Sequence, residues 1–125
     1  MTRIALEPGF GLNVEVAGAG PALVLLHGFT GSARAWGEFG DLLAAHYTTV
    51  AVDIAGHGLS DAPAELEHYR MERAIEDIVT AVERLGFARP HWLGYSMGGR
   101  TALQVAHAYP ANVRSLATIG ASPGI

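Results

Sequence analysis

The sequence predicts an α/β protein built on a mostly parallel sheet of six strands, with an antiparallel hairpin at its start and about three crossover helices. Three observations support this. Apolar runs without alternation recur, such as ALVLL over residues 22–26, and such runs are typical of strands covered on both faces. Segments with helical spacing separate these runs. Glycine or proline marks most of the boundaries.

The elements can be placed in order. Short alternating segments on either side of Pro8 and Gly9 predict the hairpin, and apolar runs predict the later strands. The expected strands are residues 3–6, 12–16, 22–26, 48–54, 91–94 and 113–119. The first expected helix is residues 32–47, capped by Ser32, with apolar residues at Trp36, Phe39, Leu42 and Leu43. The second is residues 69–85, ended by Gly86, with apolar residues at Met71, Ile75, Ile78, Val82 and Leu85. The third is residues 98–109, stopped by Pro110.

Length and composition narrow the class of protein. A chain of 125 residues predicts a single domain over residues 1–125. Eight arginines against twelve acidic residues give a net charge of −4, and without a basic run we expect no nucleic-acid partner. The chain has no cysteine, no signal-like N-terminus and no apolar stretch near the roughly 20 residues that span a bilayer. We therefore expect a cytoplasmic protein that does not bind membranes.

The segment GYSMG, residues 94–98, has the G-x-S-x-G pattern between an expected strand and an expected helix. In that context Ser96 is a candidate nucleophile on a sharp turn, and the bend leaves no room for side chains at the two glycines. The backbone N–H of Met97 then points to where negative charge develops during acyl transfer. The alternative is a glycine-rich turn that only packs closely.

A second N–H donor is expected in the loop after the strand at residues 22–26. Gly28 allows the backbone to turn inward, and the N–H of Phe29 would be the partner of the Met97 N–H in an oxyanion hole. We expect His27 to hydrogen-bond this loop into shape, with proton transfer as its alternative role.

A third loop carries Asp53, His57 and Asp61, which resemble a catalytic or metal-binding cluster. We expect hydrogen bonds that brace the loop instead. No metal and no cofactor is predicted.

Together the segments LVLLHGFTGSARAW, VAVDIAGHGLSD and GYSMGGRTALQVAHAYP resemble the α/β-hydrolase family in order and spacing, over essentially the whole chain. Within it, HGFTGS, GYSMGGR and the terminal GASPG look most like the MenH enzymes, 2-succinyl-6-hydroxy-2,4-cyclohexadiene-1-carboxylate synthases, which eliminate pyruvate. The resemblance implies that Ser96 is the nucleophile or, in MenH-like chemistry, the proton-abstracting base. It also implies that Arg100 grips a substrate carboxylate and that Tyr95 lines the pocket.

In this family the catalytic acid and histidine follow the serine, on later strands. We therefore expect the chain to be the N-terminal half of the hydrolase core, a truncated fold without the cap and the C-terminal strands. Three histidines, His46, His91 and His107, are placed away from the strand ends where the site must lie. His27 and His57 are placed on that side and are the internal candidates for the base.

The expected last strand, residues 113–119, would be an apolar edge open to pairing with another chain. We therefore expect a homo-oligomer, most simply a dimer joined through that edge.

Three functions follow as hypotheses. The first is a serine hydrolase that cleaves small carboxylic esters, weakly or only in an assembly. The second is a MenH-like lyase that needs a further half. The third is a non-catalytic half-domain that self-associates or binds small carboxylates.

Overall fold

Six strands make up one sheet, and the computed structural model describes residues 2–29, 31–62 and 66–120. The strands are β1 (Thr2–Glu7), β2 (Phe10–Ala17), β3 (Ala22–Leu26), β4 (Thr48–Val52), β5 (His91–Tyr95) and β6 (Ser115–Ile119). Their order is β1-β2-β4-β3-β5-β6. β2 is antiparallel to both β1 and β4, and the remaining pairs are parallel. The predicted fold class and its hairpin are confirmed.

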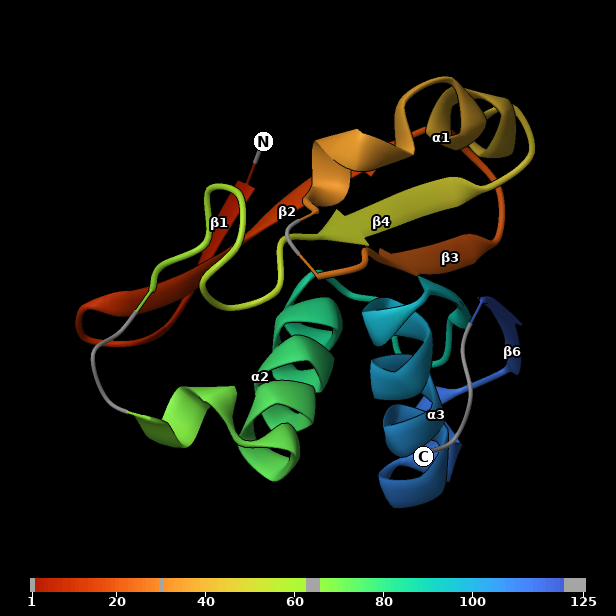
Figure 1. Ribbon diagram of the computed structural model, residues 1–125. Helices are drawn as coiled ribbons and strands as arrows, with labels where there is room; N and C mark the ends of the chain where they lie inside the picture. The colour runs from red at the N-terminus through yellow and green to blue at the C-terminus, as the bar shows by residue number, and fades with distance from the viewer. Residues whose placement is uncertain (1, 30, 63–65, 121–125) are drawn as a thin grey trace.

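Three α-helices flank the sheet on two sides (Figure 1). They are α1 (Gly37–Ala44), α2 (Met71–Arg84) and α3 (Met97–Ala108), and 3-10 turns occur at Ala33–Trp36, Leu66–Tyr69 and Pro110–Asn112. α1 lies over one face of the sheet, whereas α2 and α3 share the other (Figure 1). None of the helices among the described residues is long and apolar enough to span a membrane.

The alternation of the central strands divides the core between the two faces. In β3, Val24 is in register with Val50 of β4 and Trp92 of β5, and all three belong to the large cluster that includes residues of α2 and α3. The next residue, Leu25, belongs with Ala51 and Leu93 to the smaller cluster on the α1 side. Both faces of these strands are therefore apolar, as the unbroken apolar runs predict.

The helix expected over residues 32–47 differs from the prediction. It opens with the 3-10 turn, Ser32 makes no side-chain capping hydrogen bond, and the α-helix begins only at Gly37. The reason is local, because Gly37 adopts φ 48, which interrupts the helical path. Of the expected apolar stripe, Trp36 and Leu43 pack on the smaller cluster, whereas Leu42 is 70% exposed.

β6 is an edge strand, as the sequence predicts. Among the described residues it pairs only with β5, and most of its side chains are exposed. An open edge with exposed apolar side chains is a template for pairing with a further strand. Association through this edge stays a prediction.

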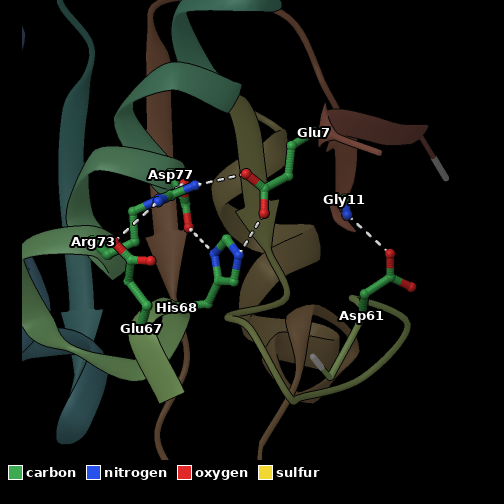
Figure 2. A network of polar contacts seen from close by, with 7 residues as sticks. All are labelled: Glu7, Gly11, Asp61, Glu67, His68, Arg73 and Asp77. Atoms are coloured by element: carbon green, nitrogen blue, oxygen red, sulfur yellow. Dashed lines mark hydrogen bonds and ion pairs between the residues drawn. The ribbon is translucent and has the colours of Figure 1, made fainter. Parts of the chain in front are cut away.

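A partly buried charged cluster joins the hairpin to α2, and it is not predicted from the sequence. His68, only 4% exposed, lies between two carboxylates (Figure 2). Its Nε2 is 2.7 Å from Oε1 of Glu7, at the end of β1, and its Nδ1 is 3.1 Å from Oδ2 of Asp77, on α2. Arg73 donates to both carboxylates, and the imidazole stacks on Phe10 with ring centroids 4.0 Å apart.

The arrangement requires a protonated imidazole, because carboxylates only accept hydrogen bonds and both ring nitrogens of His68 face one. Burial alone would lower the pKa of His68. The hydrogen bonds to Asp77 and Glu7 outweigh burial and hold that pKa above its usual value. The hydrogen bond from His68 in turn lowers the pKa of Glu7.

This cluster predicts a pH-dependent stability. Because the folded pKa of His68 is raised above the unfolded value of about 6.5, its stabilisation is complete below about pH 6.5 and is lost as the pH rises through the raised pKa. We expect His68→Gln to lower the free energy of urea-induced unfolding by about 1–3 kcal/mol near pH 6, and by much less once the pH has risen through the raised pKa of His68. His46→Gln is the control, because His46 is exposed. If the free energy of unfolding of His68→Gln varied with pH just as that of the unsubstituted protein does, the account would be contradicted.

Candidate active site

Ser96 occupies a strained turn between β5 and α3. It has φ 52 and ψ −112, and it is the sole residue other than glycine with a positive φ in the described part of the chain. Such a conformation persists only where the surroundings enforce it, and it is concentrated at functional sites. Here the Ser96 N–H donates to the Ile119 carbonyl of β6 at 2.8 Å, and the Ser96 carbonyl accepts from the Arg100 N–H at 3.1 Å.

The two glycines of the motif are required by close packing. A Cβ on Gly94 would lie 2.5 Å from Cα of Gly99, and a Cβ on Gly98 would lie 2.5 Å from the carbonyl oxygen of His27. Both distances are far inside van der Waals contact, and the clashing atoms belong to the backbone. The first turn of α3 is therefore pressed against the ends of β3 and β5, which is the physical reason that the sequence analysis gave for these glycines.

The loop after β3 lies beside the serine. A Cβ on Gly28 would be 3.6 Å from Cβ of Ser96 and 3.0 Å from the ring of Tyr95. Within the described residues, the backbone N–H groups of Phe29 and Met97 make no hydrogen bond. Both expected oxyanion donors are thus unengaged, on the two segments that meet at Ser96.

His27 fixes the direction of the Phe29 N–H. Its Nε2 accepts from the Ile54 N–H at 3.0 Å, so the proton is on Nδ1, which donates to the Gly28 carbonyl at 2.7 Å. That carbonyl also accepts from the Gly31 N–H at 2.9 Å. In a trans peptide the C=O and the following N–H point in opposite directions, so holding the Gly28 carbonyl also holds the Phe29 N–H.

The same contacts bear on His27 as a base. Burial lowers the pKa of His27, so the ring is held neutral, and both nitrogens are already used by the backbone. Neither is left to accept a proton from Ser96. The contacts match the loop-bracing role that the sequence analysis expected for this residue.

His57 lies against the same loop. Its Nδ1 is 3.1 Å from the Ala55 carbonyl, and its ring makes an edge contact with Phe29, with centroids 5.7 Å apart. No described residue hydrogen-bonds to its Nε2, and none hydrogen-bonds to the Ser96 hydroxyl. His57 therefore keeps an available nitrogen without being joined to the serine.

The carboxylates of the third loop brace it, as expected. Asp53 is buried and accepts from the Ala33 N–H at 2.6 Å, the Asn13 side chain at 2.8 Å and the Leu59 N–H at 2.9 Å. Asp61 accepts from the Gly11 N–H at 2.9 Å and pairs with Arg3 (Figure 2 shows the Gly11 contact). These bonds tie the hairpin to the loops beside the strand ends.

A cleft of about 480 Å³ opens next to the serine and is called the elbow cleft below. Its lining includes two neighbours of Ser96, Gly28 and Tyr95. Most of the remaining wall is apolar: Phe29, Trp36, Phe39 and Ile119, with His27 at one side. Phe29 and Tyr95 are expected here from the sequence, whereas Trp36 and Phe39 are expected only as apolar positions of the first helix. Their position directly after the loop carrying Phe29 was the available signal.

Arg100 is placed differently from the other expected site residues. It lies in the first turn of α3 with its side chain exposed, and it is not among the residues that line the elbow cleft. Within the described residues it forms no ion pair. The stretch GASPG, which contributed to the MenH resemblance, lies outside the described residues except for Gly120.

Comparison with known proteins agrees with this geometry. Residues 21–125 match the family described as the alpha/beta hydrolase fold, and the chain belongs to that family. The confirmed resemblance includes a Bacillus subtilis protein named as a 2-succinyl-6-hydroxy-2,4-cyclohexadiene-1-carboxylate synthase, 36% identical over 100% of this chain and 47% of its own length.

Two further matches widen the range of named activities. Bifunctional epoxide hydrolase 2 of Sus scrofa is 35% identical over 93% of this chain and 21% of its own length. The solved structure of a hydrolase from Pseudomonas aeruginosa superposes with a TM-score of 0.91 at 26% identity, over 99% of this chain and 47% of that one. The chain thus spans less than half the length of these relatives.

The packing of the elbow predicts a steep cost for one methyl group. Gly98→Ala should lower stability by about 2–4 kcal/mol or prevent folding, because the added Cβ meets backbone that cannot move aside. Thermal unfolding measures this. Gly9→Ala is the control, because a Cβ there meets nothing within 4 Å and costs only the strain of a positive φ. Equal melting temperatures for the two variants would contradict the packing argument.

Substitution of the two histidines should affect the reaction of Ser96 with a fluorophosphonate to very different extents. His27→Phe should slow labelling about 100-fold, because the Gly28–Phe29 peptide group, which carries one oxyanion donor, is then no longer held in place by the histidine. His57→Gln should change the rate less than about 3-fold. Circular dichroism checks that both variants are folded. The reverse order of effects would identify His57 as the base and remove the positioning role of His27.

Proposed function

We propose that this chain carries the nucleophile and oxyanion hole of a serine hydrolase that cleaves small carboxylic esters. The observation that carries the proposal is the positive φ of Ser96, enforced by glycines that pack against backbone. A turn that served only for close packing would not need a strained serine at its apex. The N–H groups of Phe29 and Met97, which donate to no described residue, are the second support.

The reaction would follow the usual course of acyl transfer. The Ser96 oxygen attacks the ester carbonyl while a base takes its proton, and the Phe29 and Met97 N–H groups stabilise the oxyanion of the tetrahedral intermediate. Collapse expels the alcohol, which receives the proton from the base. Water then attacks the acyl-serine by the same route, releasing the carboxylic acid and restoring the serine hydroxyl.

The base and its orienting acid are proposed to come from outside the described residues. Two sources fit: chain beyond this segment, or a second copy joined along β6. The Ile119 carbonyl accepts from the Ser96 N–H, so a strand added at β6 would lie one strand from the nucleophile. Of the two sources, a second copy at this edge is the proposed partner. The proposed location of the protein is the cytoplasm.

A MenH-like lyase is the second candidate, favoured by the identity to the Bacillus subtilis relative over the whole chain. In that reading Ser96 abstracts a substrate proton and Arg100 binds a carboxylate. The guanidinium of Arg100, which is exposed and forms no ion pair with any described residue, is compatible with it. Labelling with a fluorophosphonate cannot decide between the two candidates, because both need an activated serine. Measurement of pyruvate release from the substrate of the MenH enzymes would decide between them.

The decisive variant is Ser96→Ala. A fluorophosphonate should add its phosphonyl mass to one peptide, the one that contains Ser96, and the alanine variant should take up none. Ser32→Ala is the control, because Ser32 makes no capping hydrogen bond. Hydrolysis of 4-nitrophenyl acetate should fall to background in the first variant and stay within about 2-fold in the second. An unreactive Ser96 in the folded protein would leave a non-catalytic binding domain as the better account.

A further inference from the structure

Exposed apolar side chains gather around the elbow cleft. Nine large hydrophobic residues are exposed in the described part of the chain, and four of them line this one cleft: Phe29, Phe39, Tyr95 and Ile119. Phe29 is 72% exposed although it sits beside the nucleophile. An apolar concentration of this kind marks a surface that something covers in function.

The rings come from three separate segments and face a shared space. Trp36 and Phe39 form a stacked pair, with centroids 6.0 Å apart and an interplanar angle of 27°, at the start of α1. Phe29 belongs to the loop after β3, where its ring meets the edge of His57. Tyr95 ends β5. Aromatic rings at such positions favour a further ring in offset or edge-to-face contact.

The described lining of the cleft offers no charge to a ligand. Among the described residues no arginine, aspartate or glutamate lines it, and its histidine, His27, is held neutral by burial and by the hydrogen bond that its Nε2 accepts from the Ile54 N–H. A carboxylate placed there would lose its hydration without gaining a cation. The volume of about 480 Å³ lies within the usual range for small-molecule sites.

We infer that the elbow cleft receives an uncharged aromatic ring of the substrate, beside the scissile ester bond at Ser96. The inference rests on the proposed function, which it deepens by naming the substrate class: aromatic esters in preference to substrates that place a carboxylate next to the reacting carbon. The Trp36 and Phe39 pair at the start of α1 is the specificity-determining element.

Two-dimensional NMR of the indole N–H signals tests this in Ser96→Ala, which cannot turn over an ester. Methyl benzoate is the uncharged probe and benzoate is the charged one. The Trp36 signal should move on addition of methyl benzoate. The Trp92 signal should stay, because that indole is buried in the other core and donates to the Asn112 carbonyl at 3.0 Å. Benzoate should bind at least about 5-fold more weakly.

A matched pair of variants on α1 locates the effect. Phe39→Ala should weaken methyl benzoate binding about 2- to 10-fold, the range expected for one aromatic contact. Leu42→Ala removes another exposed apolar side chain of the same helix, one that does not line the cleft, and it should leave binding unchanged.

Each outcome decides for or against the inference. Equal or tighter binding of benzoate would overturn it, as would equal effects of the two α1 variants. If the Trp36 signal instead moves with protein concentration and methyl benzoate does not reverse the shift, a second copy occupies the cleft and the inference is overturned. If the ring binds as expected but Ser96 in the unsubstituted protein is inert to fluorophosphonate, the inference stands as a binding site and only the proposed hydrolysis fails.

Discussion

The contact on which the site depends is the one between the first turn of α3 and the end of β3. Gly98 lies against the carbonyls of Leu26 and His27, leaving no space for a side chain. With the helix held this close, the single residue between β5 and α3 must reverse the chain, and Ser96 does so with a positive φ. The strain is of order 1–3 kcal/mol and is sustained by the surrounding sheet. In the proposed reaction, the position of the serine oxygen is thus a consequence of this close packing of glycine against backbone.

The sheet supplies the remaining parts by bringing strand ends together. The loop after β3 carries Phe29, the loop after β4 carries Asp53 and His57, and β6 contributes the Ile119 carbonyl. His27 links the first two loops by accepting from one backbone and donating to the other. Asp53 adds a buried set of hydrogen bonds between the loop after β4, the hairpin and the turn before α1. Loops braced in this way keep N–H donors in place without a ligand, which is what preorganised stabilisation of charge requires.

Much of this was readable from the sequence because the signals were local. Unbroken apolar runs gave the buried strands, and G-x-S-x-G between a strand and a helix gave the elbow and the close approach of its glycines. The start of α1 could not be predicted, because it depends on the backbone angle at Gly37. The His68 cluster joins Glu7 to Asp77 across about half of the chain, so only the folded topology reveals it (Figure 2). The aromatic lining of the elbow cleft could not be predicted for a related reason. Helical spacing indicates an apolar stripe, but it does not indicate which residues of the stripe the sheet covers.

The most direct test of the account is a crystal structure of the chain after reaction with a small fluorophosphonate. The account predicts a phosphorus bonded to the Ser96 oxygen, with one phosphoryl oxygen about 2.7–3.1 Å from the backbone nitrogens of both Phe29 and Met97. Ser96 should keep its positive φ. A phosphoryl oxygen directed to solvent, or a relaxed Ser96 backbone, would contradict the claim that close packing at the elbow builds a working oxyanion hole.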